Sequence, residues 1–193
     1  MQDKKSYWKK FDKLIVTNHT SKFDVNIFAD FDIKRIDTHS QVPGQKNRKD
    51  FNLSKVRNAS LDYAAENNYD FLVVVDVDCI VYSYPSNLDD KRIGGVKFRC
   101  KSGEEIFDSR SNCRTGTASW FIIPKSLFHL RWHEGFVGYG WEDMDWAMNV
   151  VGKRGYKTYG SNMECAHISH KEEFPDGKIL KNNSALFERR KSI

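Results

Sequence analysis

Residues 71–78 read Phe71-Leu72-Val73-Val74-Val75-Asp76-Val77-Asp78. Five consecutive apolar side chains are typical of a strand that is buried on both faces, as in a parallel sheet covered by helices. Two aspartates follow without a break, and residues two apart in a strand point to the same face. The two carboxylates are therefore expected to lie close together and to repel one another unless a cation or ligand satisfies them. The alternative is that the strand ends at Val75 and both acids are solvated loop residues.

On either side of this strand, short apolar runs alternate with helical patterns, which favours an α/β fold with helices flanking a central sheet. Apolar residues recur at helical spacing from Asn52 to Asn67, and again from Trp141 to Val151, with Gly155 placed as the C-cap of the second helix. We expect strands at 14–16, 25–28, 35–37, 71–75, 95–98, 119–123 and 156–159, then an irregular His-rich stretch and a terminal helix at about 178–190.

Length and composition indicate one soluble globular domain. The chain has 193 residues, of which 39% are hydrophobic and 30% charged. No stretch approaches the ~18 to 20 consecutive apolar residues of a membrane span, and the charged start lacks the apolar core of a signal peptide. Four cysteines without a Cys-x-x-Cys pair argue for reduced thiols rather than a zinc site or a disulfide framework. We therefore expect a cytoplasmic protein without a transmembrane segment.

The charge balance favours anionic partners. The chain carries 31 Lys+Arg against 26 Asp+Glu, a formal net charge of +5, which suits nucleotides or acidic membranes. The basic residues are scattered and form no stripe with aromatic residues, so we expect no nucleic-acid partner. Basic ends leave peripheral attachment to a membrane as an alternative. The sequence lacks a P-loop, a Gly-x-Gly-x-x-Gly fingerprint and a Gly-x-Ser-x-Gly elbow, which disfavours P-loop kinases, dinucleotide enzymes and hydrolases of that type.

Two further clusters carry candidate chemistry. Residues 138–145 read Gly138-Tyr139-Gly140-Trp141-Glu142-Asp143-Met144-Asp145. Two glycines allow a tight turn that exposes aromatic faces beside a carboxylate, which suits a sugar ring, although the helix dipole alone accounts for acids in a first turn. The third cluster, at 163–170, contains His167 and His170. These histidines could ligate a metal, or one could cap a turn while the other titrates in solvent.

Taken in order, these segments resemble the nucleotide-sugar glycosyltransferases of the GT-A fold, over about residues 14–170. Residues 52–60, with Arg57 and Asn58, resemble the Arg-Asn helix of that family, and residues 71–78 resemble its Asp-x-Asp strand. Residues 136–145 are similar to the Gly-Trp-Gly-Gly-Glu-Asp-Asp-Asp stretch of the β1,4-galactosyltransferase-like module, with Met144 in place of one acid. Residues 170–173 resemble the His-Gln-Glu segment of chondroitin-synthase-type relatives.

The resemblance implies a single GT-A domain over residues 1–193, Rossmann-like, with a mostly parallel central sheet flanked by helices. The nucleotide-binding half is expected at about 11–90, the acceptor and catalytic half at about 91–175, and the terminal helix at about 178–190. The implied activity is that of an inverting hexosyltransferase. It would move a sugar from a nucleotide sugar, expected to be UDP-linked, to a hydroxyl group of a carbohydrate or glycan acceptor.

Individual roles follow from the same resemblance. Asp143 is implied as the base that removes the acceptor proton, with Glu142 orienting the acceptor or supporting the base. Acceptor binding is assigned to Tyr139 and Trp141, and donor binding to Asp30, Arg57, Asn58, Asp76, Val77 and Gly116. A divalent cation is expected at Asp76 and Asp78 together with His167 or His170. A site that mixes oxygen and imidazole ligands favours Mn²⁺ over Mg²⁺.

Three alternatives remain at the level of the sequence. A retaining glycosyltransferase of the same fold would differ in the stereochemistry of its product. A metal-dependent nucleotidyltransferase usually carries a Gly-rich phosphate loop, and the sequence has none. A catalytically silent sugar- or nucleotide-binding module would keep its function when Asp143 is replaced by Asn.

Overall fold

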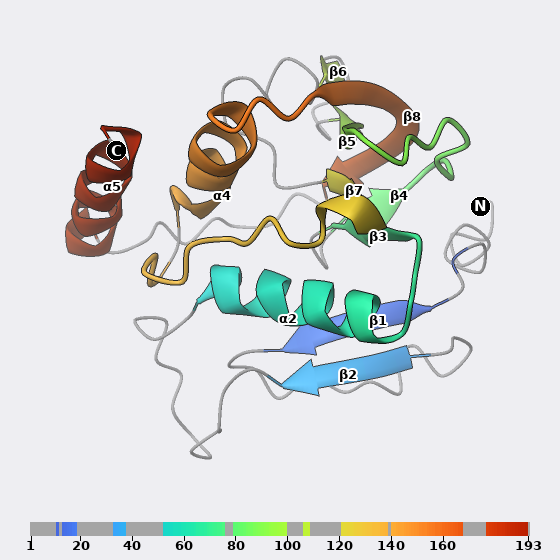
Figure 1. Ribbon diagram of the computed structural model, residues 1–193, viewed down its shortest axis with the longest axis horizontal. Coiled ribbons are helices and arrows are strands. Elements are labelled where there is room, and N and C mark those ends of the chain that lie inside the picture. Colours follow the sequence, from blue (N-terminus) through green and yellow to red (C-terminus); the bar gives the residue numbers. More distant parts are fainter. Residues whose placement is uncertain are drawn as a thin grey trace.

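The fold is mixed α/β in the computed structural model of the chain (Figure 1). The described residues are 11, 13–18, 33–37, 52–75, 79–99, 106–108, 121–138, 140–167 and 177–192. Within them, the description covers the backbone alone at 14–18, 33–37, 79–80, 97–99, 106–108 and 166–167. The expected strand at 25–28 lies outside the described residues.

Six strands form the larger sheet, in the order β3-β7-β5-β8-β4, with β6 paired to β5 at the side. Their bounds are β3 Phe71–Val74, β4 Cys79–Val81, β5 Ile93–Arg99, β6 Ile106–Asp108, β7 Phe121–Pro124 and β8 Thr158–His167. Two further strands, β1 Leu14–Asn18 and β2 Ile33–Asp37, form a separate parallel pair.

The prediction of a mostly parallel central sheet is wrong for the six-stranded sheet. Among the described residues only β5 and β8 pair in parallel there, whereas β3·β7, β5·β7, β4·β8 and β5·β6 are antiparallel. The apolar run at 71–75 predicts a strand whose two faces both pack against other residues, and the structure confirms this packing. Leu72 packs in one hydrophobic cluster, while Phe71 and Val73 pack against the other. Burial on two faces does not set the direction of the neighbouring strand, which depends on the connections.

Helix α2, Leu53–Glu66, begins and ends as its sequence predicts. The Asn52 side chain caps the N-terminus by accepting a 2.9 Å hydrogen bond from the backbone N–H of Lys55. Asn67 is the C-cap, and Asn68 follows with a left-handed φ of 61°. In Figure 1 the helix lies between the β1–β2 pair and the larger sheet, and it contacts both β1 and β3.

The helix expected from Trp141 to Val151 is confirmed in two parts. Helix α4, Glu142–Asp145, continues directly into a π-helical segment, η4, at Trp146–Gly152. Gly155 follows with a φ of 73°, in the left-handed conformation that glycine adopts most easily after a helix. A short 3-10 turn, η3 at Lys125–Leu127, connects β7 to the segment that leads toward α4.

Helix α5, Gly177–Lys191, occupies the range in which the sequence indicates a terminal helix. It packs against α4 and η4 at the side of the molecule away from β4 (Figure 1). The Lys153 ammonium, just after η4, donates a 3.1 Å hydrogen bond to the Arg190 carbonyl in the last turn of α5. The two helices are thus joined at their C-terminal ends.

The strand β8 is longer than the sequence indicates. A strand at 156–159 followed by an irregular stretch was expected, whereas β8 runs on to His167. Its burial alternates, since Ser161, Met163 and Cys165 are buried and Asn162 is exposed. The residues at 158–160 lack this alternation, and the pairing of β8 with β5 shifts register between Gly95 and Lys97. The strand is held by neighbours on both sides, β5 and β4, which local sequence does not reveal.

Candidate functional site

Two polar residues of α2, Arg57 and Asn58, are buried. The side chain of Asn58 is used by the segment after β7. Its Oδ1 accepts from the backbone N–H of Trp132, and its Nδ2 donates to the Trp132 carbonyl, each at 3.0 Å. The same Nδ2 donates to Glu134 Oε1 at 2.9 Å. Asn58 therefore fixes this segment over α2. The predicted contact between Asn58 and a nucleotide-sugar donor stays a prediction.

Arg57 reaches across to the second sequence motif. Its guanidinium forms an ion pair with the Asp143 carboxylate, and the exposed fractions of the two side chains are 3% and 12%. The same Asp143 oxygen, Oδ1, accepts a 3.2 Å hydrogen bond from the indole N–H of Trp132. The Arg57 guanidinium also lies 5.5 Å from the centroid of the Trp132 ring, at cation–π distance. The structure thus brings together the Arg-Asn helix and the Glu-Asp turn.

Two stacked indole rings, those of Trp132 and Trp146, pack next to this ion pair. The Trp132 and Trp146 rings are almost parallel, at 9°, with centroids 4.3 Å apart. The Trp146 N–H donates to the Leu130 carbonyl at 3.0 Å. Both tryptophans are at most 2% exposed and belong to the main hydrophobic cluster. Asp143 is therefore held by a rigid, desolvated surface rather than by a loop.

The turn before α4 has an unusual backbone. Gly138 and Gly140 have φ values of 81° and 100°, and Trp141 itself is left-handed at 76°. Tyr139, the predicted acceptor-binding residue between the glycines, lies outside the described residues. The Trp141 ring is half-buried and lies 5.1 Å from the ring of Phe187 in α5. The predicted acceptor residue Trp141 thus has one face against the terminal helix.

The first turn of α4 buries three carboxylates. Glu142 is 5% exposed, Asp143 9% and Asp145 0%. Acids in a first turn are favoured by the helix dipole, as the sequence indicates. Complete burial needs more than a dipole, however, because a buried carboxylate without a counter-charge is strongly destabilising. Arg57 supplies that charge for Asp143.

For Asp145 the counter-charge comes from α5, and sequence reasoning missed this pair. The Asp145 Oδ1 accepts a 2.8 Å hydrogen bond from Arg190 Nε and a 2.9 Å bond from Asn149 Nδ2. Only the Asn149 contact has a local signal, since residues four apart meet on one helix face. Arg190 is one of three basic residues in the last turn of α5, and nothing in the sequence distinguishes it as the partner.

One backbone pairing, between β4 and β8, bears on the predicted metal ligands. Asp76, Val77 and Asp78 are outside the described residues, but they join β3 to β4. The first residue of β4, Cys79, is the register partner of His167, the last residue of β8. Directly paired residues in an antiparallel pair have Cα atoms ~4.5 to 5.5 Å apart. Cys79, the residue that directly follows the Asp-x-Asp triplet in the sequence, therefore lies at the end of the strand that carries His167.

Several predicted residues cannot be placed. Asp30, Gly116 and His170 lie outside the described residues, and the side chain of His167 is not described. Within the described part of the chain, no group of three or more His, Cys, Asp or Glu side chains is arranged to hold a metal ion. Because Asp76, Asp78 and His170 do not belong to that part, the predicted cation stays a prediction.

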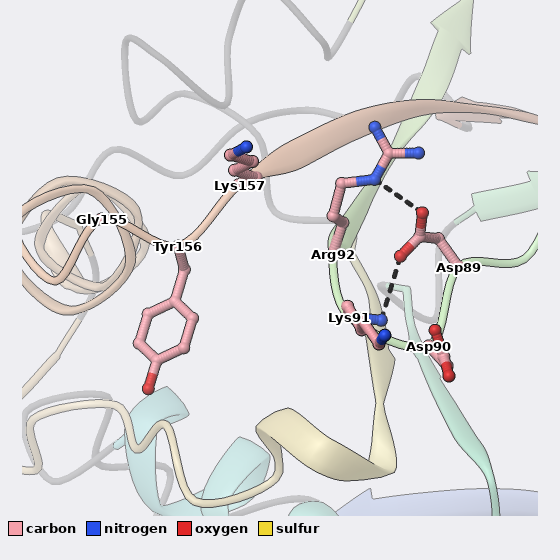
Figure 2. A pocket seen from close by; sticks show the side chains of 7 residues that line it. All are labelled: Asp89, Asp90, Lys91, Arg92, Gly155, Tyr156 and Lys157. Atoms are coloured by element: carbon pink, nitrogen blue, oxygen red, sulfur yellow. Dashed lines mark hydrogen bonds and ion pairs between the residues drawn. The ribbon is translucent and has the colours of Figure 1, made fainter.

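A surface pocket of 470 Å³ lies elsewhere, between the segment before β5 and the segment before β8 (Figure 2). Its described lining residues include none of those predicted from the sequence; they are Asp89, Asp90, Lys91, Arg92, Gly155, Tyr156 and Lys157. The Asp89 carboxylate accepts from Lys91 N–H and from Arg92 Nε, and these two bonds lower its pKa. The lining carries three basic and two acidic side chains, but it includes none of the predicted site residues, so we do not assign the site to this pocket.

One histidine near the α4–α5 junction has a perturbed pKa. Burial and the neighbouring Arg190 charge lower the pKa of His133 from its ordinary value. The backbone N–H of Gly135 donates a 3.1 Å hydrogen bond to Nδ1, which needs that nitrogen unprotonated. Burial, the Arg190 charge and this hydrogen bond thus all favour the neutral form of the His133 ring.

Comparison with protein-family models and with curated proteins finds no match to this chain. Among the helices of the described residues, none combines the length and apolar character needed to cross a bilayer. The case for a function therefore rests on the residues and on the geometry given above.

Proposed function

We propose that the chain is an inverting, metal-dependent glycosyltransferase of the GT-A type, which moves a hexosyl group from a UDP-linked sugar to a hydroxyl group of a carbohydrate acceptor. The observation that carries the proposal is the pairing of Cys79 with His167. Cys79 directly follows the Asp-x-Asp triplet in the sequence, and His167 lies about ninety residues further along the chain, so this pairing supports a site built from both clusters. Carboxylates and one imidazole are a donor set that fits Mn²⁺.

In this proposal Asp76, Asp78 and His167 or His170 hold the cation. A divalent cation at a diphosphate neutralises charge and makes the nucleoside diphosphate a better leaving group. The formal charge of the chain, +5, is consistent with an anionic donor.

Asp143 accepts the proton of the attacking hydroxyl in this proposal. The neighbouring Arg57 guanidinium favours the ionised carboxylate, which is the form that can accept a proton. The hydroxyl oxygen forms the new bond to the anomeric carbon while the bond to the diphosphate breaks on the opposite face. Inversion of configuration follows from this single displacement. Glu142, next to Asp143 in the same turn, orients the acceptor.

One observation favours the second candidate, a silent nucleotide- or sugar-binding module. Asp143 is buried, ion-paired with Arg57 and bonded to Trp132, and a carboxylate in this position stabilises a fold whether or not it takes part in catalysis. Asp143→Asn separates the candidates. A transferase retains nucleotide binding and loses transfer in this variant, whereas a silent module shows no transfer in either protein and keeps its binding function.

Thermal unfolding with UDP, GDP and CMP, each with and without Mn²⁺, tests the proposed donor site. A ligand at ~100 times its Kd adds about 2.7 kcal/mol, and each kcal/mol raises the Tm by about 2 to 4 °C for a chain of this size. We expect UDP to raise the Tm only when Mn²⁺ is present.

Two matched variants make this test specific. Asp78→Asn should abolish the Mn²⁺-dependent shift. Asp70→Asn is the control, because Asp70 is an exposed carboxylate at the opposite end of β3 and should leave the shift unchanged. A shift with GDP instead of UDP would keep the donor site and change its nucleotide. The absence of a shift with any nucleotide would contradict the proposal.

A further inference from the structure

The terminal helix holds the turn before α4 through one buried side chain. Asn183 is 4% exposed, and its Nδ2 donates to the carbonyls of Val137 and Gly140, each at 3.1 Å. A single amide nitrogen has two N–H groups, so both are used. The two carbonyls belong to residues three apart in the sequence, Val137 before Gly138 and Gly140 before Trp141.

Both described glycines of this turn lie close against α5, Gly138 more closely than Gly140. A Cβ at Gly138 would be 2.5 Å from Ile179 Cγ2, and one at Gly140 would be 3.0 Å from Leu180 Cδ2. On its other side, Gly138 forms a parallel bridge with Asn52, the N-cap of α2. The turn is therefore fixed between α2 and α5, with Asn183 between its two ends.

The turn leads straight into the residues assigned to the acceptor. Trp141 is the N-cap of α4, and Glu142 and Asp143 are its first two residues. Trp141 is held in a left-handed conformation directly after Gly140. A displacement of the Val137 or Gly140 carbonyl is therefore expected to shift Trp141 and the first residues of α4 as well. The residues assigned to the donor are not linked to α5 in this way. The Asp-x-Asp triplet connects β3 to β4 in the sequence, whereas α5 packs on α4 and η4.

We propose that Asn183 is a positioning residue that sets the affinity of the site for its carbohydrate acceptor by fixing the 137–141 turn. This inference rests on the proposed function and deepens it. Asn183 acts through the backbone of the turn and makes no contact with the substrate. Its loss weakens acceptor binding and leaves nucleotide binding unchanged.

The test uses Asn183→Asp, which keeps the shape of the side chain and replaces both N–H donors by an oxygen. Asn182→Asp is the matched control, because Asn182 is exposed on the same turn of α5 and receives the same charge. The Kd of UDP with Mn²⁺ is measured by calorimetry. The acceptor KM and kcat are measured for transfer from UDP-hexoses to a panel of p-nitrophenyl glycosides.

We expect Asn183→Asp, which removes both hydrogen bonds to the turn, to raise the acceptor KM by about tenfold, which corresponds to about 1.4 kcal/mol. The Kd of UDP stays within about twofold of the wild-type value, and Asn182→Asp changes neither quantity. Should Asn183→Asp fail to fold, Asn183→Ser keeps a single donor and is measured in the same way.

An unchanged acceptor KM in a variant of Asn183 that binds UDP would overturn the inference and leave the proposed function intact. Equal losses of acceptor and UDP affinity would also overturn it, because they indicate a general loss of structure. A wild-type protein that binds no nucleotide overturns the proposed function first, and the inference with it.

Discussion

The ion pair between Arg57 and Asp143 is buried on both sides, with exposed side-chain fractions of 3% and 12%. Arg57→Met leaves the Asp143 carboxylate buried without a counter-charge, and the expected loss of unfolding free energy is about 3 to 5 kcal/mol. Urea unfolding at neutral pH measures this loss. Arg154→Met, the same change at an exposed arginine after η4, should cost under about 0.5 kcal/mol.

A compensating variant separates charge from packing. Arg57→Met combined with Asp143→Leu should recover most of the loss, because replacing a buried ion pair with apolar residues is often close to neutral. If Arg57→Met costs no more than Arg154→Met, the carboxylate of Asp143 is solvated and its role in the site must be reconsidered.

At the level of residues, the sequence predicts which side chains belong to the candidate site better than it predicts which side chains they contact. Arg57, Asn58 and Asp143 are singled out by the resemblance, and two of them form an ion pair in the structure. Trp132, which both Asn58 and Asp143 contact, has no local signal, because it lies 74 residues from Asn58. Contacts of this range are set by tertiary packing, which periodicity does not report.

At the level of elements, two glycines with the same backbone conformation have different surroundings. Gly138 and Gly155 have φ values of 81° and 73°. A Cβ at Gly138 meets Ile179 of α5, whereas nothing lies within 4 Å of one at Gly155. Gly155→Ala should therefore cost only the left-handed backbone penalty, about 1 to 2 kcal/mol. Gly138→Ala should cost about 1 to 3 kcal/mol more, from overpacking against the helix.

Chemical denaturation of both variants gives this difference directly. Adding Ile179→Ala to Gly138→Ala removes the obstructing side chain and should recover part of the excess loss. Equal losses for the two glycine variants would mean that α5 does not press on the turn.

Elements with local signals are those that the sequence predicts best. The ends of α2 follow from Asn52 and Asn67, because caps depend on neighbouring residues. The three-residue strands β4 and β6 are too short to show a period and were not predicted. The antiparallel direction of β7 against β3 depends on long connections, so an apolar run cannot supply it.

At the level of the whole molecule, Cys165 reports on the opening of the larger sheet. It lies in β8 between β5 and β4, is 0% exposed, and burial raises its pKa to about 12 from an ordinary value of 9.0. Between those values the unfolded chain loses the thiol proton and the folded chain keeps it. This group therefore lowers stability as the pH rises above about 9, and has no effect on stability below it.

At pH 8, iodoacetamide should label the Cys165 peptide only when the sheet opens. Val81→Ala, at the register partner of Cys165, should cost about 2 kcal/mol and speed labelling about 30-fold. Val137→Ala is the control, because Val137 is 42% exposed. Mass spectrometry of the labelled peptide measures the rate. Labelling of the wild-type protein at pH 8 that is faster than its global unfolding equilibrium allows would show that β8 opens locally.

The sequence predicts the α/β character of the molecule, because alternating helical and apolar segments are local features. It does not predict how the segments are arranged, since the Cys79–His167 and Asp145–Arg190 contacts each join distant parts of the chain. The candidate site was thus predicted as a set of residues. The structure adds the ion pair, the indole stack and the terminal helix that hold part of that set.

The Asp145–Arg190 pair has a consequence for the order in which the chain matures during synthesis. Asp145 leaves the ribosome 45 residues before the arginine that neutralises it. Burial of an uncompensated carboxylate is too costly to precede its partner. The first turn of α4 must therefore stay hydrated on the nascent chain until the last turn of α5 has been made. On this basis, the packing of α4 against α5 is completed only after translation has passed residue 190.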